Sequence, residues 1–153
     1  MADTVQETIL ARLAVVFEGI TTGGGYNNTI HSVKRQSVAG TEFESYPSIA
    51  FQAVRETIKA RIYPTLDFDM TVECEVWEQM DGSAGTYLDK ELAELMGDMQ
   101  KAVMLDTQLN SLCKYCVPSK REYYRDEVSS CGVGVLTLKI GYTTDADDPT
   151  TGK

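Results

Sequence analysis

The segment Cys113-Lys114-Tyr115-Cys116 contains the one residue spacing in this sequence that could indicate a metal site or a redox site. Two cysteines separated by two residues can supply half of a zinc site or form a redox dithiol. A complete zinc site would need Cys74 and Cys131 as well, but both lie in or beside predicted strands, where a small apolar residue is the usual occupant. A redox dithiol usually opens a helix, whereas this pair precedes Pro118 in a predicted strand. We therefore interpret the four cysteines as buried or semi-buried free thiols and keep a structural metal and a redox pair as alternatives.

Histidine and carboxylate side chains offer little else for catalysis. His31 is the only histidine, so a catalytic triad or a Cys-His pair would have to use it, yet it lies in a polar segment without a nucleophile motif. The chain has 23 acidic residues, so adjacent pairs such as Glu73 and Glu75 arise by chance and form the solvated face of a strand. We predict no catalytic, metal-binding or cofactor-binding residue and expect a protein that is not an enzyme.

Length and charge narrow the function classes further. A chain of 153 residues, 42% of them apolar, suits one domain with one core. The 14 basic against 23 acidic residues give a formal net charge of −9, which disfavours binding along nucleic acid unless the few cations cluster. An acidic wall would suit a channel past which DNA slides without sticking, although plain solubility is the simpler explanation.

Neither a membrane span nor an export signal is expected. The longest apolar cluster, Leu13 to Phe17, is far shorter than the roughly 18 residues that a spanning helix needs. The first residues carry no basic segment before an apolar one, so we expect a soluble protein that assembles in a cytoplasm.

Apolar periodicity predicts two amphipathic helices. The first runs from Val5 to Ile20, and Asp3 with Gln6 has the spacing of a capping box before it. The second runs from Leu88 to Met104 and follows the glycine-containing break Asp81 to Gly85.

Alternation of apolar and polar residues predicts the strands. In the clearest one, Met70 to Glu78, four apolar side chains face one way, and acids with Trp77 face the other. The last strand is Gly132 to Tyr142, with Leu136, Leu138, Ile140 and Tyr142 on one face and Val133, Val135, Thr137 and Lys139 on the other. Weaker strands are expected in residues 26–37, 48–54 and 112–117, and the basic stretch 55–61 is a candidate continuation of the second of these.

The order of these elements predicts an α+β domain spanning residues 1–153. A single mostly antiparallel or mixed β-sheet would carry two amphipathic helices packed on one face. Pro118 to Ser130 is expected to be a charged connection, and the acidic tail from about residue 143 is expected to be irregular.

Aromatic side chains among charges indicate protein contacts. Tyr123 and Tyr124 lie beside Arg125 and other cations, but nearby acids cancel most of that charge, so we favour a protein-binding hairpin or loop over nucleic acid. Trp77 on the outward strand face suggests the same role if exposed, and burial under a loop is the alternative.

The closing segment Leu138 to Pro149, with its Tyr142-x-Thr-Asp-x-x-Asp-Pro pattern, resembles the last strand and tail of tail terminator (tail-completion) proteins of long-tailed bacteriophages. Other blocks follow the order of that family: Gly25-Tyr26, then Val33-Lys34-Arg35, then Tyr46-Pro47 before a short apolar strand, and Leu109-Asn110 after the second helix. The resemblance spans nearly the whole chain by pattern and order, and only the C-terminal tail approaches a motif.

The resemblance implies a structural virion protein at the tail-neck junction. Such proteins form a six-membered ring that caps the tail tube, stops its polymerisation and docks the head-side connector; in contractile tails the ring also meets the sheath. DNA would pass through the lumen without specific binding. The alternatives are a head-tail connector or neck protein and, from another class, a small thiol- or zinc-dependent protein that uses Cys113 and Cys116. The interface candidates are Tyr26, Arg35, Trp77, Tyr123, Tyr124, Arg125, Tyr142, Asp145, Asp147, Asp148 and Pro149.

Overall fold

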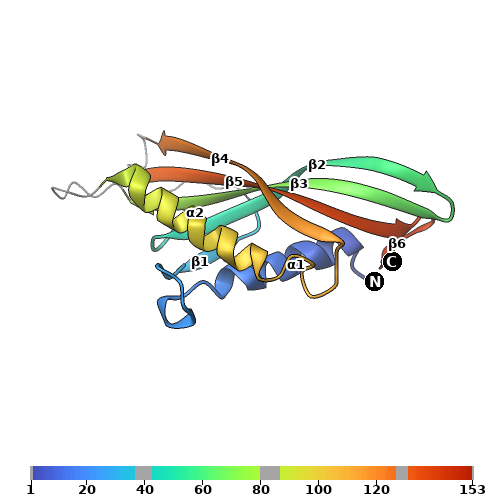
Figure 1. Ribbon diagram of the computed structural model, residues 1–153, viewed down its shortest axis with the longest axis horizontal. Coiled ribbons are helices and arrows are strands. Elements are labelled where there is room, and N and C mark those ends of the chain that lie inside the picture. Colours follow the sequence, from blue (N-terminus) through green and yellow to red (C-terminus); the bar gives the residue numbers. More distant parts are fainter. Residues whose placement is uncertain (1, 37–42, 80–86, 127–130, 153) are drawn as a thin grey trace.

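The computed structural model describes residues 2–36, 43–79, 87–126 and 131–152, and the predicted break Asp81 to Gly85 lies outside them. Its elements are α1 (Val5–Glu18), the 3-10 turn η1 (Thr22–Gly24), β1 (Ser32–Lys34), β2 (Ser48–Ile62), β3 (Thr65–Gln79), α2 (Leu88–Met104), β4 (Tyr115–Asp126), β5 (Cys131–Asp145) and β6 (Asp148–Gly152). The strands form one sheet in the order β1-β2-β3-β5-β4, and β6 pairs with β5 (Figure 1). Only β1 and β2 pair in parallel among these strands, so the fold is α+β with a mixed sheet, as predicted.

Both helices lie where their apolar periodicity predicts them. The first begins at a different cap, because the side chain of Thr4 rather than Asp3 accepts a hydrogen bond, from the backbone N–H of Glu7 at 3.2 Å. It ends at Glu18, before Gly19, two residues short of the predicted end. The second helix has the predicted bounds, Leu88–Met104. It lies close to β5, because a Cβ on Gly132 would meet the side chain of Leu88 at 2.7 Å.

The central hairpin is longer than predicted. β2 and β3 each contain 15 residues and pair from Ser48 opposite Trp77 to Ile62 opposite Thr65. The basic stretch 55–61 therefore does continue the strand, as the sequence suggests. β1 is much shorter than the predicted 26–37 and pairs only with Ser48–Ala50. Within the described residues, no strand pairs with the side of β2 away from β3 between Phe51 and Ile62, so this part of the sheet edge is open.

The expected charged connection after Pro118 is a strand instead. β4 runs along β5 from Tyr115 opposite Gly141 to Asp126 opposite Cys131. As the last strand of the sheet, β4 can keep charges in solvent on both of its faces, which removes the alternation that a half-buried strand shows. Pro118 lies beside a register irregularity of this edge strand, where a missing N–H is tolerated. Residues 127–130 of the predicted connection lie outside the described residues.

The C-terminal tail is also regular, so the prediction of an irregular segment from residue 143 is wrong. Thr143 and Thr144 are buried within β5, and β6 folds back to pair with its end. Asp148 begins β6, and its carboxylate accepts hydrogen bonds from the backbone N–H of Thr150 and the hydroxyl of Thr151 at 3.0 and 2.8 Å within that strand. A turn-rich composition indicated the reversal but not the short strand that follows it.

The two faces of the sheet pack differently. We call the first face the one that carries Met70, Val72, Cys74 and Val76 of β3 and Leu136, Leu138 and Ile140 of β5. These side chains join buried residues of both helices in the main core cluster. The second face carries the alternate residues and a smaller cluster, formed by Phe43, Ala50, Trp77, Cys131, Val133 and Val135. No helix among the described residues has the length and apolar character needed to cross a membrane.

Candidate interaction surfaces

The strand β4 presents the predicted pair of tyrosines to solvent. Tyr123 and Tyr124 are 48% and 53% exposed and alternate along the strand, so they point to opposite sides of the sheet. Arg125 is exposed next to them, and Lys120 forms an ion pair with Glu122 at 3.0 Å. These side chains therefore lie together on a sheet edge rather than on a loop. We define the β4 surface as Lys120, Glu122, Tyr123, Tyr124 and Arg125.

The opposite edge of the sheet carries a second exposed group that the sequence interpretation did not select. We define the β2 edge as the exposed apolar and basic residues of distal β2 and its turn: Val54, Arg55, Ile58, Lys59, Arg61, Ile62 and Tyr63. Ile62 and Tyr63 are 71% and 87% exposed. An open strand with apolar side chains and unpaired backbone groups is a place where another chain can bind.

The cations of the β2 edge are available to a partner. In the part of the chain that the structure describes, no ion pair involves Arg55, Lys59 or Arg61. The one acid of this strand, Glu56, accepts a hydrogen bond from the hydroxyl of Tyr142 on the first face. A basic run interleaved with Ile58 and Ile62, directly after a predicted strand, was the sequence feature that could have identified this edge.

The second face of the sheet is acidic along β3. Asp67 accepts hydrogen bonds from Thr143 and from Lys114, and these two contacts hold its pKa below the ordinary value. Asp69 accepts a hydrogen bond from the hydroxyl of Tyr115 at 3.3 Å. Glu73 and Glu75 follow on the same face, closer to the small apolar cluster. The β2 edge and this face are thus oppositely charged.

Trp77 does not belong to the exposed surface. Its side chain is only 7% exposed, packs on the second face beside Phe43 and donates a hydrogen bond from Nε1 to Glu75 at 3.1 Å. The prediction of an exposed tryptophan is wrong because Phe43, from the segment before β2, lies over it with ring centroids 6.1 Å apart. The alternative prediction, that Trp77 is buried under a loop, is confirmed.

Three other interface candidates have roles within the fold. Tyr26 is half-buried, with the ammonium of Lys101 4.9 Å from its ring centroid. Arg35 forms a two-pronged ion pair with Glu7, at 2.8 and 3.0 Å. Tyr142 is buried and stacks on Phe68, with ring centroids 5.1 Å apart. Burial and its hydrogen bond to Glu56 raise the pKa of the Tyr142 hydroxyl.

The candidates of the C-terminal tail lie at the far end of β5 from the β4 tyrosines. Asp147 and Pro149 are exposed, whereas Asp145 and Asp148 are half-buried around the β5–β6 turn. Tyr124 pairs with Val133 near the start of β5, and Asp145 ends that strand, so the two groups are on the order of 40 Å apart along the strand. The structure therefore separates the predicted contact residues into two groups rather than one site.

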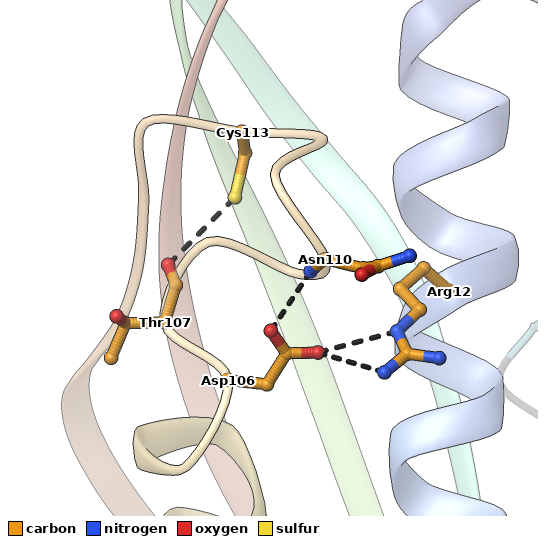
Figure 2. Close-up of polar contacts among 5 residues, drawn as sticks. All are labelled: Arg12, Asp106, Thr107, Asn110 and Cys113. Atoms are coloured by element: carbon orange, nitrogen blue, oxygen red, sulfur yellow. Dashed lines mark hydrogen bonds and ion pairs between the residues drawn. The ribbon is translucent and has the colours of Figure 1, made fainter.

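The cysteine segment is buried next to a tight turn. All four cysteines are buried thiols. The thiol of Cys113 donates to the carbonyl of Thr107 at 3.9 Å (Figure 2). Burial, with the nearby charge of Asp106, raises the pKa of Cys113 to about 11, and burial also raises the pKa of Cys116. Raised pKa values keep both thiols protonated near neutral pH, which is unfavourable for a nucleophile or a zinc ligand.

Asp106 holds the turn before these cysteines in an unusual backbone conformation. Leu109, Asn110 and Ser111 have φ values of 45°, 58° and 67°, in the left-handed region that residues other than glycine rarely adopt. The Asp106 carboxylate accepts from the backbone N–H of Asn110 at 2.8 Å and from Nε and Nη2 of Arg12 at 3.2 and 3.0 Å (Figure 2). These contacts tie the turn to α1 and give it a structural role.

Within residues 2–36, 43–79, 87–126 and 131–152, no cluster of three or more His, Cys, Asp or Glu side chains could hold a metal ion. Comparison of the chain with protein-family models and with curated protein sequences finds no match. A function must therefore be argued from the surfaces themselves.

Proposed function

We propose that this chain is a structural virion protein, a tail terminator that forms a ring on the tail tube, stops its polymerisation and docks the head-side connector. The resemblance of residues 138–149 and of the order of blocks suggested this role. The observation that supports it is that, among the described residues, the sheet has two different edges without a further strand: the part of β2 beyond the short β1 at one end of the strand order, and β4 at the other.

A closed ring of identical subunits needs two different contact surfaces on each subunit, because a head-to-tail contact joins unlike patches. The β2 edge and the β4 surface lie at opposite edges of the sheet and have different side chains. Each has exposed aromatic or aliphatic groups among cations, a composition that protein interfaces favour. A monomer with no partner would expose both edges to aggregation.

We also infer that both helices cover the first face, which leaves much of the second face for partners. Phe17 of α1 meets Phe51 of β2 edge-on, with ring centroids 5.7 Å apart. On α2, the side chain of Met96 lies 3.0 Å from where a Cβ on Gly134 would be. Phe51 belongs to the main cluster, and Gly134 lies on the same side of β5 as Leu136.

The partners of this ring would be the tail tube protein below it, the head-tail connector above it and, in a contractile tail, the sheath. The site of action would be the tail-neck junction, after assembly in the host cytoplasm. DNA would pass the lumen without specific binding. A connector or neck protein would use the same kinds of surface and differ in which rings it touches.

The proposal is tested by removing the gene from the phage that encodes the chain. Without a terminator, tubes should grow to uncontrolled lengths and lack heads, as seen by negative-stain microscopy. Complementation with the wild-type chain should restore tails of uniform length. Tails of normal, uniform length in the mutant would contradict the proposal.

A further inference from the structure

The β2 edge is cationic in a chain whose formal net charge is −9. Arg55, Lys59 and Arg61 surround the exposed Ile58 and Ile62, and the neighbouring strand β1 stops before it reaches them. Cations that gather on an open apolar edge mark a surface that attracts an acidic partner with an accessible apolar component.

An acidic area of suitable chemistry lies on the second face of the same sheet. We define the acidic patch as Glu73, Glu75 and Glu122, which flank Thr137 and Val135 in the registers of β3, β5 and β4. Two cations lie within or beside it: Lys120 pairs with Glu122, and Lys139, next to Thr137 on the same face, donates to the hydroxyl of Thr71. The exposed Tyr124 adds an aromatic group at its border.

The centre of the acidic patch contains a buried polar group without a partner. The Thr137 side chain is 4% exposed, and its hydroxyl has no hydrogen-bond partner among the described residues. Its register places it between Glu73 and Lys120 on the second face. A buried hydroxyl left unsatisfied is unfavourable, but its oxygen is inaccessible, so an incoming cation would be bound by the carboxylates around it.

The end of the β2 edge cannot reach the acidic patch of its own molecule. Arg61 lies opposite Leu66 of β3, whereas Glu73 lies farther along the same strand. At about 3.3 Å per residue, these positions are about 20 Å apart, beyond the reach of one side chain. The distal cations Lys59 and Arg61 can therefore meet the acidic patch only between molecules, whereas Arg55, opposite Thr71, lies two residues from Glu73 on the same face of its own molecule.

We propose that the β2 edge of one copy binds the acidic patch of a second copy. The inference rests on the proposed function for its choice of partner, since a ring brings identical chains side by side. Each copy then supplies one basic edge and one acidic patch, and the contact repeats until the ring closes.

The contact is tested by reversing charges on each side. The edge variant is Lys59→Glu with Arg61→Glu, and the patch variant is Glu73→Lys with Glu122→Lys. Matched controls are Lys90→Glu and Glu94→Lys on the exposed side of α2. Circular dichroism checks that every variant is folded, and sedimentation velocity measures self-association at low and at high salt.

Each reversed variant alone should self-associate about tenfold or more weakly than the wild type, because attraction becomes repulsion. An equal mixture of the two should recover wild-type assembly, since a reversed edge then meets a reversed patch. The controls should assemble normally, and high salt should weaken the wild-type contact. If the wild-type chain assembles only on tail tubes, the variants, their mixture and the controls are compared by the fraction of tube ends that they cap.

Variants that assemble as well as the wild type, or a mixture of folded variants that stays dissociated, would overturn the inference. If the variants assemble as well as the wild type and the wild-type chain caps tail tubes, the proposed function stands and only the inference about this contact fails. A wild-type chain that neither self-associates nor caps tubes would remove both. Binding of short duplex DNA that the edge variant loses, with a wild-type chain that stays monomeric, would assign the β2 edge to DNA and overturn the inference.

Discussion

On the first face of the sheet, β3 and β5 present fully buried apolar side chains, while the same two strands present acids, threonines and Lys139 on the second face. The first face joins one large cluster with the helices, and the second has a small cluster near one end. β3 thus has one buried apolar face and one half-buried polar face that includes the buried Trp77, whereas β5 is buried on both faces except at Lys139 and Asp145. Substitutions on the two faces should differ accordingly.

Phe51→Ala on the first face should have the largest effect on stability. The ring is 1% exposed and packs against Phe17, so its removal leaves a cavity between the sheet and α1. The free energy of unfolding should fall by about 3–5 kcal/mol, as measured by urea denaturation. A loss below about 1 kcal/mol would mean that this face is not the main source of stability.

Phe43→Ala is the matched change on the second face and should cost less, about 1–3 kcal/mol. Phe43 is 6% exposed, and its cluster has few members, so the half-buried Tyr46 can move into part of the space. The same urea titration compares it with Phe51→Ala. Equal losses would remove the distinction between the faces.

Thiol labelling should show which face opens more readily. Cys116 belongs to the main cluster and Cys131 to the small one, and both are fully buried. Mass spectrometry after alkylation should find Cys131 modified about tenfold faster, because small clusters open at lower free energy.

The Cys116 rate should also rise with pH, since only the thiolate reacts once the cluster has opened. The reverse order of labelling would contradict the comparison. Rapid labelling of Cys113 and Cys116 in the native protein would favour the thiol-dependent alternative.

Tyr124→Ala should have the smallest effect on the fold. The side chain is 53% exposed on the edge strand, so the free energy of unfolding should change by no more than about 0.5 kcal/mol. Because Tyr124 borders the acidic patch, ring formation should weaken more than stability. A large loss of stability with unchanged assembly would show that the residue serves packing instead.

The sequence was most informative where burial is one-sided. Alternation identified the core of β3, and the helical period identified α2 with its bounds, whereas β5, which is buried on both faces, has apolar residues on both. One face of each such element must be apolar to be buried, so the pattern follows from the packing. The pattern also placed Trp77 on the correct face, but it did not show that Phe43 covers it.

The sequence was least informative at the sheet edges. β4 and distal β2 are exposed on both faces, so Lys120 to Arg125 and Arg55 to Arg61 lack alternation although they form strands. These two segments are strands because β4 pairs with β5 and distal β2 pairs with β3. Composition alone does not predict such pairing. The same holds for β6, which exists because it pairs with the end of β5.

The most direct test of a structural, ring-forming role is negative-stain microscopy of the purified chain mixed with purified tail tubes. We predict a ring on one end of each tube, and no further growth of that end when tube protein is added. Bare ends that continue to grow in the presence of excess folded chain would contradict the account.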